Sequence, residues 1–74
     1  MQALTRDEFN RLVDFEQVNY INSLCQSQGC RKFLRYQRGQ IIDADSGESV
    51  NNIYDYALDL HYEATDLKGL VFSD

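Results

Sequence analysis

The residue types that most often carry catalysis are scarce in this chain, which has one histidine, His61, and two cysteines, Cys25 and Cys30. A catalytic histidine usually needs a carboxylate that orients its ring. If His61 lies on a helix, the residues three and four positions away from it are all uncharged: Ala57, Leu58, Ala64 and Thr65. The sequence therefore predicts that the protein is not an enzyme.

Metal and cofactor sites are not indicated either. Asp59, His61 and Glu63 alternate along the chain, and residues two apart on a helix point in nearly opposite directions, so they do not converge on one ion. The chain has no G-x-x-x-x-G-K motif, no G-x-G-x-x-G motif and no EF-hand loop. We expect no cofactor and no bound metal.

The two cysteines are not spaced as in a CxxC motif, and the chain has no further cysteines to complete a four-ligand zinc site. We expect two reduced thiols, Cys25 on a helix and Cys30 near the start of a strand. The alternative is a disulfide across the helix end. That bond requires Cα atoms within about 6 Å of each other and an oxidising compartment.

Charge is distributed unevenly along the chain, whose formal net charge is −5 at pH 7. No acidic residue occurs from Gln17 to Ile42, where four cations lie close together: Arg31, Lys32, Arg35 and Arg38. From Asp43 to Asp74 there are eight acidic residues against Lys68 alone. The acidic total disfavours general binding to nucleic acid or to anionic lipid.

The basic segment interleaves its cations with aromatic side chains. On a β-ribbon, such cations can contact phosphates while an aromatic ring stacks on a base, and the residues placed to do so are Arg31, Lys32, Arg35, Tyr36 and Arg38. Binding through so few cations would be weak and strongly salt-dependent. The alternative is that Arg31, Lys32 and Arg35 pair across the hairpin with Asp43 and Asp45, and across the domain with the helix that follows.

The clearest periodic pattern spans residues 52–69 and predicts an amphipathic helix. Its apolar positions form one stripe fit for a core: Ile53, Ala57, Leu60, Ala64 and Leu67. A second ridge is acidic: Asp55, Asp59, Glu63 and Asp66. Between the two lies an aromatic flank with no evident use within the fold: Tyr54, Leu58, His61 and Tyr62.

This helix suggests a protein partner. Many rows of charge are simply solvated helix faces, which is the alternative interpretation. A row of carboxylates can also steer association with a basic surface, and aromatic side chains are common anchors of interfaces. The predicted partner-binding residues are Asp55, Asp59, Glu63, Asp66, Tyr54, Leu58 and Tyr62.

The N-terminal part of the chain predicts one long helix. Thr5 and Glu8 fit a capping box, and Gly29 is placed to end the helix, so we expect it over about residues 6–28, with a break near 19–22 as the alternative. The expected core stripe is Phe9, Val13, Tyr20 and Leu24, flanked by Leu12 and Ile21, with Phe15 and Val18 outside it.

A β-hairpin is expected next, with strands at about residues 31–37 and 40–45 joined by Arg38 and Gly39. A turn at residues 45–48 leads to a cap at Ser49, Asn51 or Asn52 and a helix over about residues 50–68. Gly69 ends that helix, and the apolar residues 70–72 fold back onto the core or form a third short strand. The prediction is an α+β fold of order α-β-β-α, in which two amphipathic helices pack with one antiparallel hairpin in a single domain of residues 1–74.

We interpret the chain as a small acidic protein-binding module, an inhibitor or regulator that docks its acidic and aromatic helix on a basic site of a larger protein. Many small inhibitors encoded by phages and mobile elements have this size and charge. The alternatives are a nucleic-acid-binding regulator that uses the hairpin, a structural subunit, or a homodimer. No apolar run approaches the roughly 20 residues that span a bilayer, and the first ten residues lack a secretory pattern, so the expected location is the cytoplasm, away from membranes.

Overall fold

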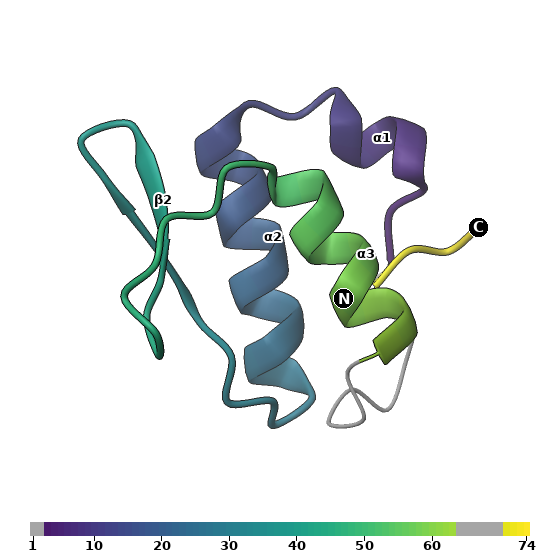
Figure 1. Ribbon diagram of the computed structural model, residues 1–74. Coiled ribbons are helices and arrows are strands. Elements are labelled where there is room, and N and C mark those ends of the chain that lie inside the picture. Colours follow the sequence, from purple (N-terminus) through teal and green to yellow (C-terminus); the bar gives the residue numbers. More distant parts are fainter. Residues whose placement is uncertain (1–2, 64–70) are drawn as a thin grey trace.

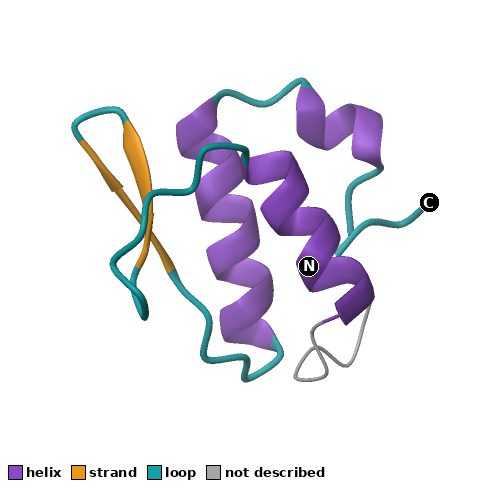
Figure 2. Ribbon diagram, viewed as in Figure 1, coloured by secondary structure: helices purple, strands orange, loops and turns teal. Residues whose placement is uncertain are grey.

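The computed structural model describes residues 3–63 and 71–74. The elements follow in the order α1 (Arg6–Asn10), α2 (Asp14–Ser27), β1 (Leu34–Gln37), β2 (Gln40–Asp43) and α3 (Ile53–Glu63) (Figure 1). Helix α2 lies in the middle, with the β-hairpin on one side and α3 on the other (Figure 2). This confirms the predicted α+β class and the helix–strand–strand–helix order. Within these residues, no helix has the length and apolar character needed to cross a membrane.

The single helix predicted over residues 6–28 is wrong, because the structure has two helices separated at residues 11–13. The start of α1 is as expected. The Glu8 N–H donates to Thr5 Oγ1 at 3.2 Å, and the Thr5 N–H donates to the Glu8 carboxylate at 3.0 Å, which is the predicted capping box. The break also does not lie at 19–22, where α2 is continuous.

The break allows residues from opposite faces of one helix to reach the same core. Phe9 and Val18 would point about 180° apart on a continuous helix. In the fold both are buried, with exposed fractions of 0% and 3%. Val13, which was expected in the core, is 62% exposed at the break. The end of α1 is stabilised by the buried side chain of Gln17, whose amide donates to the Phe9 carbonyl at 2.9 Å.

The rest of the predicted stripe is confirmed. Tyr20, Ile21 and Leu24 are buried on α2, and Phe15 is exposed as expected. The prediction that Val18 lies outside the core is wrong, because Val18 is buried. The largest fully buried side chains come from α1, α2, β1 and the C-terminal residues: Phe9, Ile21, Cys25, Leu34, Val71 and Phe72.

Helix α2 ends as the glycine predicts. Gly29 has φ +73° and donates its N–H to the Gln26 carbonyl at 3.3 Å, while the Cys30 N–H donates to the Cys25 carbonyl at 2.8 Å. These two bonds form a Schellman motif, in which a residue in the left-handed conformation closes the last turn of the helix.

The hairpin turn also follows the prediction. Arg38 and Gly39 have φ values of +52° and +77°, which is the pattern of a two-residue type I′ turn, and Gln37 pairs with Gln40. The strands are shorter than predicted, beginning at Leu34 and ending at Asp43. Residues 31–32 stay outside the ladder, because the last rung is the bond from the Ala44 N–H to the Phe33 carbonyl at 2.9 Å.

The hairpin packs on α2 through Leu34, which is 1% exposed. A polar contact adds to this packing: the Asn22 side-chain amide donates to the Leu34 carbonyl at 2.9 Å and accepts the Leu34 N–H at 2.9 Å. Both backbone groups that Leu34 turns away from β2 are therefore satisfied by one side chain of α2.

The C-terminal residues fold back onto the core, as predicted. Val71 and Phe72 are buried, and Phe72 makes a single parallel bridge with Leu4. The Ser73 N–H donates to the Leu4 carbonyl at 2.8 Å, and the Tyr20 hydroxyl bonds the backbone on both sides, accepting from Leu4 at 3.0 Å and donating to Val71.

Asn52 is the cap of α3, since its Oδ1 accepts the N–H groups of Tyr54 and Asp55 at 3.1 and 3.2 Å. The predicted stripe is confirmed for Ile53, Ala57 and Leu60, which are all buried. The remaining predictions for this helix lie outside the described residues: Ala64, Asp66, Leu67, the end at Gly69 and Leu70.

Candidate protein-binding surface

The acidic ridge lies on the exposed face of α3. Asp55, Asp59 and Glu63 are all exposed, at successive turns of the helix. Asp55 and Asp59 line a hollow of about 370 Å³ that two other carboxylates also line, Asp43 at the end of β2 and Glu48 in the following segment. We call these four residues, with their carboxylates, the acidic hollow. Asp66 lies outside the described residues.

A tight turn brings Asp43 and Glu48 to this hollow. The Asp43 carboxylate accepts the Asp45 N–H at 2.9 Å, and its backbone carbonyl accepts the Gly47 N–H at 2.8 Å. The Glu48 carbonyl then accepts the Asp43 N–H at 2.9 Å, so the chain returns alongside β2 before it enters α3. The signal in the sequence is a pair of acids on either side of a Ser-Gly turn, but their approach to α3 depends on the tertiary fold.

The acidic hollow has no basic partner in the described part of the chain. Within residues 3–63 and 71–74, one ion pair is found, between Arg6 and Asp74, whose Nε and Oδ1 atoms are 3.8 Å apart. Arg6 also contacts Tyr62 in the last turn of α3. The four acidic residues therefore line one hollow with no cation of the described residues within 4 Å of their carboxylates. Like charges that line one hollow repel one another.

The aromatic flank of α3 has a structural use that the sequence interpretation missed. The Tyr54 and His61 rings pack on Phe72, with centroids 6.0 and 5.6 Å from the Phe72 ring, and Leu58 is half-buried against the core. His61 Nδ1 also accepts the Phe72 N–H at 3.2 Å. His61 thus holds the C-terminal residues in place, and no signal in the local sequence reveals this contact.

Tyr62 is the exposed member of this flank, with 64% of its surface accessible. Its hydroxyl accepts a hydrogen bond from the Arg6 guanidinium, which also reaches Asp74. Of the predicted aromatic anchors, Tyr62 is therefore the one that offers most of its ring to a partner.

The cations of the hairpin are exposed, and the alternative of ion pairs across the hairpin is wrong for the described residues. Arg35 lies opposite Ile42, and Asp43 lies opposite Leu34 and bonds its own turn. No carboxylate of the described residues lies within 4 Å of Arg31, Lys32, Arg35 or Arg38.

The predicted nucleic-acid residues do not share one face. Side chains alternate along a strand, so Arg35 and Tyr36 point to opposite sides of the hairpin. Tyr36 packs edge-on against Phe15 of α2, with ring centroids 6.1 Å apart, whereas Phe33 lies on the side of Arg35 and is 48% exposed. An aromatic ring beside the cations is therefore supplied by Phe33 and not by Tyr36.

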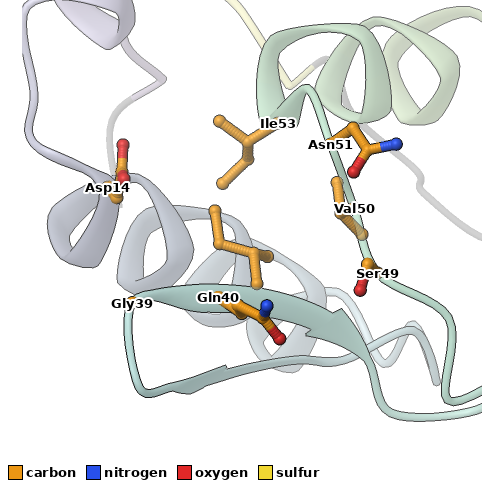
Figure 3. A pocket seen from close by; sticks show the side chains of 8 residues that line it. Asp14, Gly39, Gln40, Ser49, Val50, Asn51 and Ile53 are labelled. Carbon is orange, nitrogen blue, oxygen red and sulfur yellow. The ribbon is translucent and has the colours of Figure 1, made fainter.

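A second hollow, of about 270 Å³, lies between the hairpin tip and the first turns of α2 and α3 (Figure 3). Ile53 and Val50 give it an apolar part, and Asp14, Gln40 and Asn51 give it a polar part (Figure 3). With one carboxylate among its lining residues, this hollow lacks the concentration of charge that marks the acidic hollow.

The remaining chemistry-bearing residues form no recognisable catalytic or metal site within the described ranges. Cys25 and Cys30 are buried and not joined by a disulfide, and no group of three histidine, cysteine, aspartate or glutamate residues there is arranged to hold a metal ion. In comparisons with known proteins, no family model, no curated protein and no solved structure matches this chain.

Proposed function

We propose that this protein is a small protein-binding module that docks the acidic hollow and the adjoining face of α3 on a basic site of a larger protein, as an inhibitor or regulator of that protein. The observation that carries the proposal is the convergence of carboxylates from two separate segments on one hollow, with no cation of the described residues beside them.

Charge supports a docking role for physical reasons. Four carboxylates that surround one hollow weaken the isolated fold slightly, whereas a lysine or arginine from a partner would relieve their repulsion. Long-range attraction also raises the rate of association with a basic site. Glu63 and Tyr62 extend the same helix beyond the hollow, and Tyr62 offers an exposed aromatic ring.

The test compares two charge reversals of equal size. The protein and two variants, Asp59→Lys in the acidic hollow and Glu16→Lys on the exposed surface of α2, are used to capture partners from an extract of the cells that express the protein, with nuclease present. We expect the wild type and Glu16→Lys to retain one defined protein, and Asp59→Lys to lose it by at least tenfold. Equal capture by both variants would exclude the acidic hollow as the docking site.

The second candidate is a nucleic-acid-binding regulator that uses the hairpin. It is favoured by the four exposed cations, which have no carboxylate partner within 4 Å in the described part of the chain, and by Phe33 on the same side as Arg35. A double substitution of Arg35 and Arg38 by alanine should weaken oligonucleotide binding and reduce its dependence on salt, while Arg11→Ala should leave both unchanged. If the wild type binds no oligonucleotide at low salt, this candidate is excluded.

A further inference from the structure

The end of α2 brings two thiols together. In a Schellman motif, the third residue from the end of the helix and the second residue beyond its cap are joined by a backbone hydrogen bond, and their side chains commonly touch. In this chain those two positions are Cys25 and Cys30, and the bond from the Cys30 N–H to the Cys25 carbonyl is 2.8 Å long. Gly29, with φ +73°, supplies the left-handed residue that makes this approach possible.

The surroundings of the two thiols differ. Cys25 is 1% exposed inside the core, and Cys30 is 9% exposed at its margin. Burial raises the pKa of Cys25 to about 12, and the neighbouring Cys30 thiol, which is within hydrogen-bonding range, contributes to the shift. At neutral pH Cys25 is therefore protonated and buried in the core, and Cys30 is the thiol that an external reagent meets first.

We propose that Cys25 and Cys30 form a thiol–disulfide exchange site, at which a small-molecule disulfide such as oxidised glutathione converts the two thiols to an intramolecular disulfide. This proposal is independent of the proposed docking function. The geometric requirement for a disulfide is a Cα separation of about 4.4–6.8 Å with side chains directed at each other, which is the arrangement that the Schellman motif favours.

The exchange takes place in two steps. Cys30 loses its proton to solvent, and its thiolate attacks one sulfur of the external disulfide, which forms a mixed disulfide and releases one small thiol after protonation. Cys25 then loses its proton as its sulfur attacks Cys30 Sγ, which forms the Cys25–Cys30 bond and releases the second small thiol. Two protein thiols are oxidised and one external disulfide is reduced to two thiols.

The test uses the full chain and counts thiols. Reduced protein is equilibrated with mixtures of reduced and oxidised glutathione under native conditions, trapped by an alkylating reagent in denaturant, and analysed by intact mass. We expect the doubly alkylated monomer to be replaced by a monomer with no alkyl group. The oxidised monomer should remain folded, with a thermal midpoint raised by roughly 5 °C or more, because the bond restricts the unfolded chain.

Two variants separate the roles of the thiols. Cys25→Ser should accumulate the mixed disulfide of glutathione at Cys30, because the second attacking thiol is absent, while Cys30→Ser should leave the buried Cys25 thiol unmodified. Three wild-type results would each overturn the proposal, and none depends on how the variants fold: thiols that both stay reduced in fully oxidised glutathione, disulfide-linked dimers, or an oxidised monomer that is unfolded.

Discussion

The two flanks of α3 use polar and aromatic side chains for different purposes. On one flank, Tyr54 and His61 pack on Phe72, and His61 Nδ1 accepts the Phe72 backbone N–H at 3.2 Å. On the other flank, Asp55 and Asp59 line the acidic hollow, and no cation of the described residues lies within 4 Å of either carboxylate. One flank is occupied by the protein's own C-terminal residues, and the other lines the acidic hollow.

This difference reduces the set of α3 residues that we expect to bind a partner. Tyr54 and His61 stabilise the fold, so they are not spare groups set aside for a partner, whereas Tyr62 is exposed. The carboxylates contribute little to the fold, because they neither pair with cations in the described part of the chain nor reach the core. Substitutions on the two flanks should therefore separate stability from binding.

The largest effect is expected at Phe72, which is 0% exposed and contacts Phe9 as well as the aromatic flank. Phe72→Ala should lower the free energy of unfolding by about 3–5 kcal/mol, because it leaves a cavity in the core. Phe15→Ala removes an aromatic ring that is 56% exposed and should cost about 1 kcal/mol or less. Denaturant titration followed by circular dichroism measures both, and equal losses would contradict the assignment of Phe72 to the core.

A smaller effect is expected at His61. His61→Phe keeps a ring on Phe72 but removes the acceptor of its N–H, so the free energy of unfolding should fall by about 1–2 kcal/mol. Hydrogen exchange at the Phe72 amide should become faster in the variant. If that amide exchanges at the wild-type rate, the bond to His61 does not hold the C-terminal residues.

The smallest effect is expected on the acidic flank, and it has the opposite sign. Asp55 and Asp59 are four residues apart on α3, so Asp59→Asn should raise the free energy of unfolding by about 0.2–0.5 kcal/mol by removing a repulsion between like charges. Added salt should erase this gain, since it screens exposed charges. A loss of stability in Asp59→Asn at low salt would show that this carboxylate supports the fold.

Signals confined to a few neighbouring residues predicted the structure well. The capping box at Thr5, the end of α2 at Gly29 and the two-residue turn at Arg38 and Gly39 all follow from local backbone chemistry. The stripe of α3 was also predictable, because Ala57 and Leu60 recur at helical spacing.

Contacts between residues that are distant in the sequence account for the features that the sequence did not predict. The break between α1 and α2 depends on Gln17, whose side chain reaches back to the Phe9 carbonyl. No glycine or proline lies between these two residues to signal a break in the sequence. The acidic hollow could be half predicted, because Asp55 and Asp59 share a helix face whereas Asp43 reaches them only through the folded turn. The role of His61 depends on a residue that follows it by eleven positions and returns from the end of the chain.

The paired bonds between Asn22 and Leu34 also bear on aggregation. A strand at the margin of a sheet offers N–H and C=O groups to which a strand of another molecule can add. On β1 the Leu34 groups are occupied by the Asn22 amide, and on β2 the Ile41 carbonyl is occupied by the Val50 N–H at 2.8 Å. Strand addition is thus hindered at Leu34 on β1 and at Ile41 on β2. Asn22→Val should open the β1 margin and lower the concentration at which the protein forms β-rich aggregates.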